Sequence, residues 1–132
     1  MSIKGLDHIS IIVSDLEENL NFYRDTLGFS IVRDFYDEKE KARIVFLNIG
    51  NTMLELIAPD DRPSEGMKTS WEERKIGGVE HIALLVDNMD DTYNYLKSKG
   101  IDFILGPIEF PDGKYGYFYG PDGVLLEVIC WK

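Results

Sequence analysis

Two histidines and two glutamates stand at matching places in this sequence and could together hold a metal ion. His8 and His81 are separated by 73 residues, and Glu55 and Glu127 by 72. Each glutamate interrupts a run of apolar residues, where an isolated carboxylate is costly unless something compensates its charge. Two imidazoles and two carboxylates suit Zn²⁺, Ni²⁺, Co²⁺, Mn²⁺ or Fe²⁺. These four residues therefore predict a single divalent metal site.

Each of the four residues also has an ordinary structural interpretation. A histidine in a strand can be a satisfied structural residue, and a glutamate there can face solvent. Alternation along a strand could place any of these side chains on a wet face. The histidine-to-glutamate separation is 47 residues in the first pair and 46 in the second. This repetition favours metal ligation, because clusters of ligand-type residues mark metal sites.

The two pairs belong to a longer internal repeat. Residues 5–13 match residues 78–86, and residues 52–57 match residues 124–129 at nearly the same offset. Several matches in one order suggest that a whole unit has been duplicated.

The repeat divides a single domain, residues 1–132, into modules at about 4–58 and 78–131. The intervening segment 59–77 is polar, with Pro, Gly and mixed charges, and is predicted to be a linker. Its Trp71 either packs over the core or lines a substrate entrance. Packing is favoured, because an aromatic ring carries a large apolar surface.

The first module is predicted to contain one helix among four strands. Asp15 is a candidate N-cap, with Glu18 at the capping-box position. Apolar side chains then recur at helical spacing, at Leu16, Leu20, Tyr23 and Leu27. Gly28 is expected to end the helix. The predicted strands cover residues 6–13, 29–36, 43–49 and 52–58.

The second module is predicted to repeat that order. We expect a strand at 79–86, a helix at 89–99, weaker strands near 102–105 and 115–119, and a strong strand at 124–131. Each module is thus β-α-β-β-β, and the fold class is α+β. Tyr115, Tyr117 and Tyr119 alternate and share one strand face, either a core face or the wall of an aromatic pocket.

Composition narrows the possible partners. The formal net charge of -10 argues against nucleic acid and anionic membranes. Cys130 cannot form an internal disulfide and is expected to be a buried structural thiol. The N-terminus lacks the apolar region of a secretory signal, and no apolar run approaches the length of a membrane span. We therefore expect a cytoplasmic protein that binds a small molecule.

Taken together, these motifs resemble the vicinal oxygen chelate superfamily, which includes glyoxalase I, methylmalonyl-CoA epimerase, fosfomycin-resistance proteins, extradiol dioxygenases and bleomycin-resistance proteins. The resemblance spans nearly the whole chain. It is carried by Asp7-His8-Ile9, by Phe22-Tyr23 with Leu27-Gly28-Phe29, by Leu54-Glu55-Leu56, by Glu80-His81-Ile82-Ala83, and by Gly120-Pro121-Asp122-Gly123 ahead of Glu127.

The resemblance implies paired βαβββ modules that form an open, cup-shaped mixed sheet around a metal. It implies that His8, Glu55, His81 and Glu127 are the ligands, a set most similar to bacterial glyoxalase I with Ni²⁺, Co²⁺ or Zn²⁺. It further implies a homodimer and an isomerase or lyase that converts an α-oxoaldehyde–thiol adduct through an enediolate. Glu127 is the implied base, and Glu55 the second acid/base.

Two departures bear on the substrate. Glyoxalase I enzymes that use glutathione carry an arginine where this chain has Ile12 and an asparagine where it has Pro59. The alternatives are an epimerase of the methylmalonyl-CoA type, whose family usually has Gln where Glu55 stands, and a metal-free drug-binding resistance protein.

Overall fold

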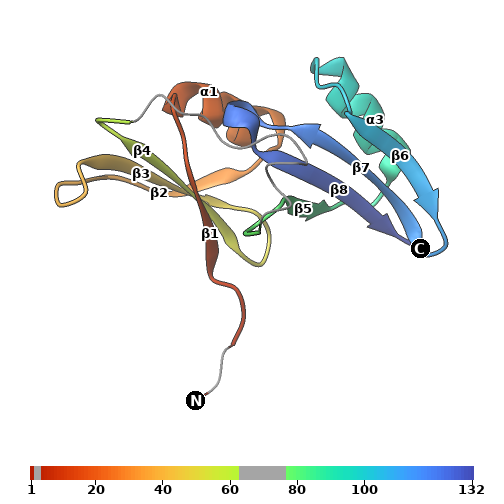
Figure 1. Ribbon diagram of the computed structural model, residues 1–132, viewed down its shortest axis with the longest axis horizontal. Coiled ribbons are helices and arrows are strands. Elements are labelled where there is room, and N and C mark those ends of the chain that lie inside the picture. Colours follow the sequence, from red (N-terminus) through yellow and green to blue (C-terminus); the bar gives the residue numbers. More distant parts are fainter. Residues whose placement is uncertain (2–3, 63–76) are drawn as a thin grey trace. The chain divides into compact units, whose positions relative to one another are not determined.

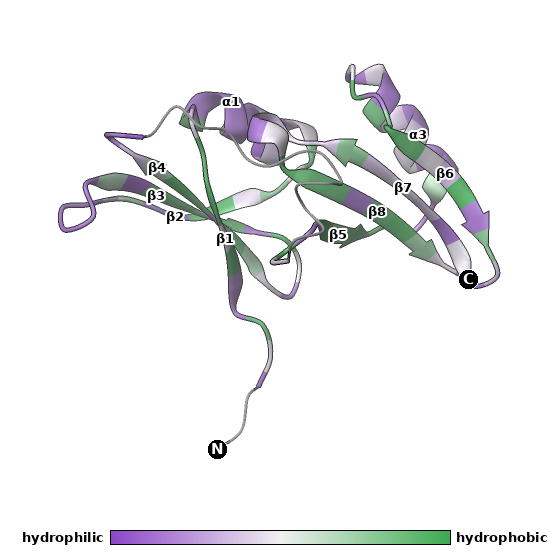
Figure 2. Cartoon of the chain, in the orientation of Figure 1, coloured by the Kyte–Doolittle hydropathy of each residue, from purple (hydrophilic) through white to green (hydrophobic). Residues whose placement is uncertain are grey.

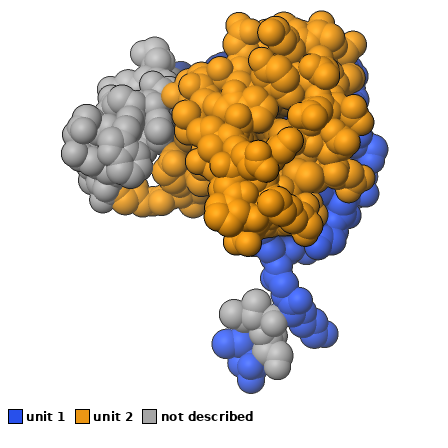
Figure 3. All heavy atoms as spheres, turned by 90° about the vertical axis from the view of Figure 1, so that its right-hand side faces the viewer, with its two compact units in different colours: residues 1–65 blue, residues 66–132 orange. Residues whose placement is uncertain are grey.

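The computed structural model describes residues 1, 4–62 and 77–132, which belong to two compact units, residues 1–65 and residues 66–132 (Figures 1 and 3). Each unit contains one four-stranded mixed sheet, and the order of elements repeats as β-α-β-β-β. The predicted α+β fold of two tandem modules is confirmed. Most of the predicted linker, including Trp71, lies outside the described residues.

The sheet of unit 1 has the order β1-β4-β3-β2. Its strands are β1 (His8–Ile12), β2 (Ser30–Asp37), β3 (Ala42–Asn48) and β4 (Met53–Pro59). The first and last strands run parallel, and the other neighbours are antiparallel. The chain therefore returns its last strand to the side of its first.

The helix of unit 1 begins where the sequence predicts. Asp15 is the N-cap of α1 (Leu16–Leu20), and its carboxylate accepts a hydrogen bond of 3.0 Å from the Glu18 backbone N–H. The helix continues as a wider π-helical segment, η1 (Asn21–Thr26), in which the Leu27 N–H reaches the Phe22 carbonyl. Gly28 then turns the chain at φ 82°, a left-handed conformation that favours glycine.

Unit 2 has the equivalent sheet order β5-β8-β7-β6 and one helix, α3 (Met89–Ser98). Its strands are β5 (Ile82–Leu85), β6 (Leu105–Phe110), β7 (Gly113–Tyr119) and β8 (Leu125–Trp131), with a short 3₁₀ turn, η2 (Pro121–Gly123), before β8. Figure 2 shows β8 as largely hydrophobic with a hydrophilic interruption. β5 and β8 are parallel, as β1 and β4 are in unit 1.

The weak strand predicted near 102–105 is wrong in position. The strand β6 begins only at Leu105, and the Phe103 ring that precedes it packs 5.4 Å from Phe118 and 5.1 Å from Tyr93. Pairing with β7 then continues past Pro107 through an irregular register. An edge strand tolerates such a proline, because one side of it has no ladder to complete.

Alternation divides each sheet into a core face and an opposite face. In unit 1 the buried side chains include Val45, Leu47, Leu54 and Leu56, and in unit 2 they include Phe118, Leu126 and Val128. Glu55 lies between two buried leucines of β4 and therefore projects from the opposite face. No helix within the described residues is long and apolar enough to cross a membrane.

We expect Asp15→Ala to lower the free energy of unfolding by about 1 kcal/mol, because it removes the cap of α1. Urea unfolding followed by circular dichroism would measure the change. Asp15→Asn is the matched control, since asparagine caps equally well, and equal stability of the two variants would contradict the capping role.

Candidate metal centre

In unit 1 the histidine of the first strand faces the glutamate of the last. His8 Nε2 is 3.6 Å from Glu55 Oε1, and both residues project from the face opposite the core. The other ring nitrogen, Nδ1, is 2.8 Å from Asp7 Oδ2. The imidazole thus stands between two carboxylates, one beside it in sequence and one on the neighbouring strand.

Unit 2 repeats this arrangement. His81 Nε2 is 2.8 Å from Glu127 Oε2, and His81 Nδ1 is 3.2 Å from Glu80 Oε1. His81 directly precedes β5, so the strand is shorter than the predicted 79–86. Glu127 is only 7% exposed, and its charge therefore requires compensation.

The atom separations within each pair fit two ligands of one ion. Nitrogen and oxygen atoms that lie about 2.0–2.2 Å from a metal, at tetrahedral or octahedral angles, stand roughly 2.8–3.6 Å apart. The observed 2.8 Å and 3.6 Å fall at the limits of this range. An imidazole that donates from Nδ1 to a carboxylate keeps the Nε2 lone pair for a cation, the usual arrangement around ligating histidines. The geometry of each pair is therefore compatible with two ligands of one divalent ion.

Each glutamate also accepts a hydrogen bond from a hydroxyl group, and the hydroxyl comes from non-equivalent strands in the two units. In unit 1 the Ser10 hydroxyl of β1 donates to Glu55, which stands opposite it in register. Ala83 holds the equivalent place in unit 2, opposite Glu127. There the phenol of Tyr117, opposite Glu127 on β7, supplies the hydrogen bond. Phe46 holds the equivalent place in unit 1 and has no hydroxyl.

The environment of Tyr117 disfavours its ionisation. Burial, followed by the charge of Glu127 and the hydrogen bond to it, raises the pKa of the Tyr117 phenol to about 12. The phenol is therefore a hydrogen-bond donor throughout the neutral range. Its ring also stands edge-on to His81, with centroids 5.2 Å apart, as Phe46 stands to His8 at 5.3 Å.

The structure places the three tyrosines of β7 on the face opposite the core. Tyr117 adjoins the second pair, and Tyr115 extends the aromatic row from it, with ring centroids 5.9 Å apart. Both side chains are partly buried, whereas Tyr119 is exposed. The tyrosine face of β7 is the Glu127 face of the sheet, not the core face.

Cys130 lies on the other face of β8, at a cleft of about 220 Å³ beside the start of α3. The thiol is partly buried and donates to the Asp87 carbonyl at 3.3 Å. Cys130 is three residues after Glu127 in β8, and alternation therefore places the two side chains on opposite faces of the sheet. A structural role for the thiol agrees with this contact.

The structure therefore places the four predicted ligands as two pairs, one in each unit. Among the residues that the structure describes, no group of three or more His, Cys, Asp or Glu side chains could hold a metal ion. Sharing of one cation by both pairs remains a prediction. Sequence reasoning missed Ser10, Asp7 and Glu80, although an acidic residue precedes each histidine of the repeat.

The fold and the candidate site define a protein built from two βαβββ modules, each with one histidine–glutamate pair. The model of the Glyoxalase/Bleomycin resistance protein/Dioxygenase superfamily matches residues 5–128, and the chain belongs to this superfamily.

Three relatives illustrate the range within it. The mitochondrial methylmalonyl-CoA epimerase of Mus musculus is 36% identical over 93% of this chain and 71% of its own length. The metallothiol transferase FosB of Staphylococcus haemolyticus is 31% identical over 96% of this chain and 83% of its own. A solved glyoxalase family protein from Enterococcus faecalis has a TM-score of 0.80 and 26% identity, and covers 98% of this chain and 99% of that one.

The raised pKa of Tyr117 predicts a late phenol titration in the metal-free protein. The phenol is favoured in the folded state, so this contribution to stability is complete below pH 10 and is lost as the pH rises through about 12. Ultraviolet titration should show that Tyr117→Phe removes one late-ionising phenol. Tyr119→Phe is the control from the same strand, and loss of an early-ionising phenol from Tyr117→Phe would contradict the assignment.

Proposed function

We propose that this protein is a metal-dependent enzyme that removes a proton next to a carbonyl group of a small substrate and returns it. His8, Glu55, His81 and Glu127 hold one divalent cation between them. A single observation carries the proposal: the chain builds the same imidazole–carboxylate pair twice, each time with a second carboxylate on the far ring nitrogen.

The donor atoms fit the cation expected for such a set. Two neutral imidazoles and two carboxylates offer two nitrogens and two oxygens, which suits Ni²⁺, Co²⁺ or Zn²⁺. Because Glu127 is buried in a protein of net charge -10, a cation is the natural compensation for its charge. When bound, the cation would polarise the substrate carbonyl and stabilise the charge that develops on it as the proton leaves.

The residues of the chain then divide the proton transfer. Glu127 is the proposed base, and the Tyr117 hydroxyl keeps its carboxylate oriented. Glu55 is the second acid/base, and the Ser10 hydroxyl donates a hydrogen bond that orients its carboxylate beside His8. A positioned carboxylate of this kind contributes about 10²- to 10⁴-fold to a proton transfer.

Two reactions use this chemistry, and a different observation favours each. The His-Glu-His-Glu set favours a glyoxalase I-like conversion of an α-oxoaldehyde–thiol adduct to a thioester. The similarity to methylmalonyl-CoA epimerase favours inversion of the carbon next to an acyl thioester. Ile12, an apolar residue 52% exposed on β1, cannot hold a glutathione carboxylate, so a thiol other than glutathione is proposed for the first reaction.

Metal content is the first test. Protein purified without added metal and then titrated with Ni²⁺, Co²⁺ or Zn²⁺ should bind one ion for each set of two pairs. His8→Ala and His81→Ala should each weaken binding by more than the roughly 10- to 100-fold that an outer-shell change costs. Elemental analysis and calorimetry measure both quantities.

Glu127→Gln should behave like the histidine variants, with the exposed Glu109→Gln as the charge-matched control. Retention of wild-type affinity by either histidine variant would refute shared ligation. A wild type that takes up no cation would point to the metal-free, drug-binding class.

The same variants test the proposed homodimer. If the site is shared between two chains, co-expressed His8→Ala and His81→Ala chains regain one intact site in each mixed dimer. If both pairs belong to one chain, the mixture regains none. Light scattering gives the oligomeric state independently.

Isotope exchange distinguishes the two reactions. Nickel- or cobalt-loaded protein in deuterium oxide should incorporate deuterium next to the thioester of methylmalonyl-CoA if it is an epimerase. It should form a thioester from methylglyoxal and bacillithiol or a cysteine-type thiol if it is glyoxalase I-like. Glu127→Gln should slow either reaction at least about 10²-fold. Absence of both activities from the loaded wild type would count against the proposed proton transfer.

A further inference from the structure

Among the residues that the structure describes, Arg33 of β2 has no acidic partner, unlike Arg24 and Arg43. Arg24 is bonded to Asp25 at 2.8 Å, and Arg43 to Asp34 at 2.7 Å. No carboxylate among the described residues lies within ion-pairing distance of Arg33. Arg33 is exposed, so its guanidinium is accessible to a ligand from solvent.

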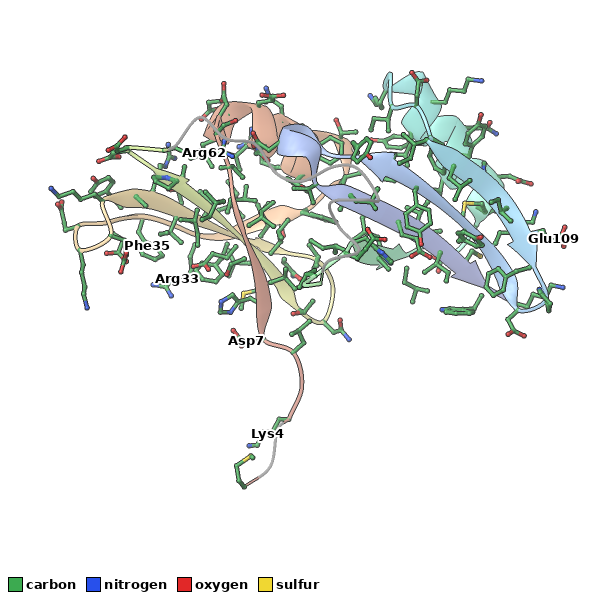
Figure 4. The ribbon with its side chains drawn as sticks, viewed as in Figure 1. Lys4, Asp7, Arg33, Phe35, Arg62 and Glu109 are labelled. Carbon is green, nitrogen blue, oxygen red and sulfur yellow. The ribbon has the colours of Figure 1, made fainter. Side chains whose placement is uncertain are left out.

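The Arg33 side chain is held by aromatic rings instead. Its guanidinium carbon lies 4.8 Å from the centroid of Phe35 and 5.9 Å from that of Phe46. Figure 4 shows the side chain reaching away from the sheet with Phe35 nearby. A guanidinium attracted to an aromatic face in this way still has N–H groups available to an anion.

Strand register places this guanidinium beside the first histidine–glutamate pair. Arg33 stands opposite Phe46, and Phe46 stands opposite Glu55, so the three side chains form one row on one face. Two strand spacings separate the Arg33 and Glu55 backbones, roughly 10 Å. The Phe46 ring also contacts the His8 ring edge-on.

The duplicated unit shows that the fold does not require an arginine in this row. Leu105 of β6, opposite Tyr117, occupies the corresponding place in unit 2. Glu55 and Asp7 would repel an anionic substrate from the first histidine–glutamate pair. The positive charge of Arg33 offsets this repulsion for an anionic group that reaches the guanidinium.

We propose that Arg33 binds a carboxylate of the substrate. The substrate class is then a small acid with two neighbouring oxygens for the metal at one end and a carboxylate a few bonds away, which the guanidinium grips in bidentate fashion. The inference rests on the proposed metal site and adds the chemistry of the substrate's other end.

Two probes that differ only at the far end test it. 2-Oxoglutarate has neighbouring oxygens and a distal carboxylate, whereas 2-oxopentanoate has the same head and no distal charge. Calorimetry on metal-loaded wild type should show preference for 2-oxoglutarate by roughly 10- to 100-fold, the effect of hydrogen bonds to a charged group. Arg33→Gln should abolish the preference, and Arg33→Lys should keep part of it.

Arg43→Gln is the matched control, because it removes the same charge from the opposite face of the same sheet. It should leave the preference intact. Equal affinity of wild type for both probes, or a preference that survives Arg33→Gln, would overturn the role of Arg33. Metal titration of the same samples separates this result from failure of the metal site, which would appear as loss of cation binding in wild type.

Discussion

Parallel pairing of the first and last strand in each module is the constraint on which the candidate site depends. The chain must carry β4 back to β1, and β8 back to β5, before a histidine and a glutamate 46 or 47 residues apart can meet. The connecting helix and two antiparallel strands serve this return. Because both units close in the same way, each produces one imidazole–carboxylate pair on the face opposite its core.

Much of the fold could be predicted from local chemistry. Asp15 caps a helix and Gly28 ends it because their physical preferences operate over a few residues. The π-helical segment and the start of β6 could not be predicted in this way. Phe103 is of a residue type common in strands, but it lies before β6 and its ring packs against Phe118 of β7.

The two histidine–glutamate pairs could be picked out for a different reason, namely that the duplication repeats them, and their role as ligands stays a prediction. Their surroundings required the register of the strands. Ser10 meets Glu55, and Arg33 aligns with Phe46, only because particular residues stand opposite each other across the sheet. The sequence predicts that Tyr117 shares a strand face with Tyr115 and Tyr119. It could not predict that this face also carries Glu127.

The hydroxyl that donates a hydrogen bond to the glutamate comes from a different strand in each unit. Ser10 corresponds to Ala83 in the repeat, and Phe46 corresponds to Tyr117, so each unit has a hydroxyl at only one of the two positions beside its glutamate. In a protein built from two identical halves, every substitution would alter both histidine–glutamate pairs at once. In a duplicated chain the two halves can differ, and here each keeps its carboxylate while the surroundings of the two carboxylates are chemically unlike.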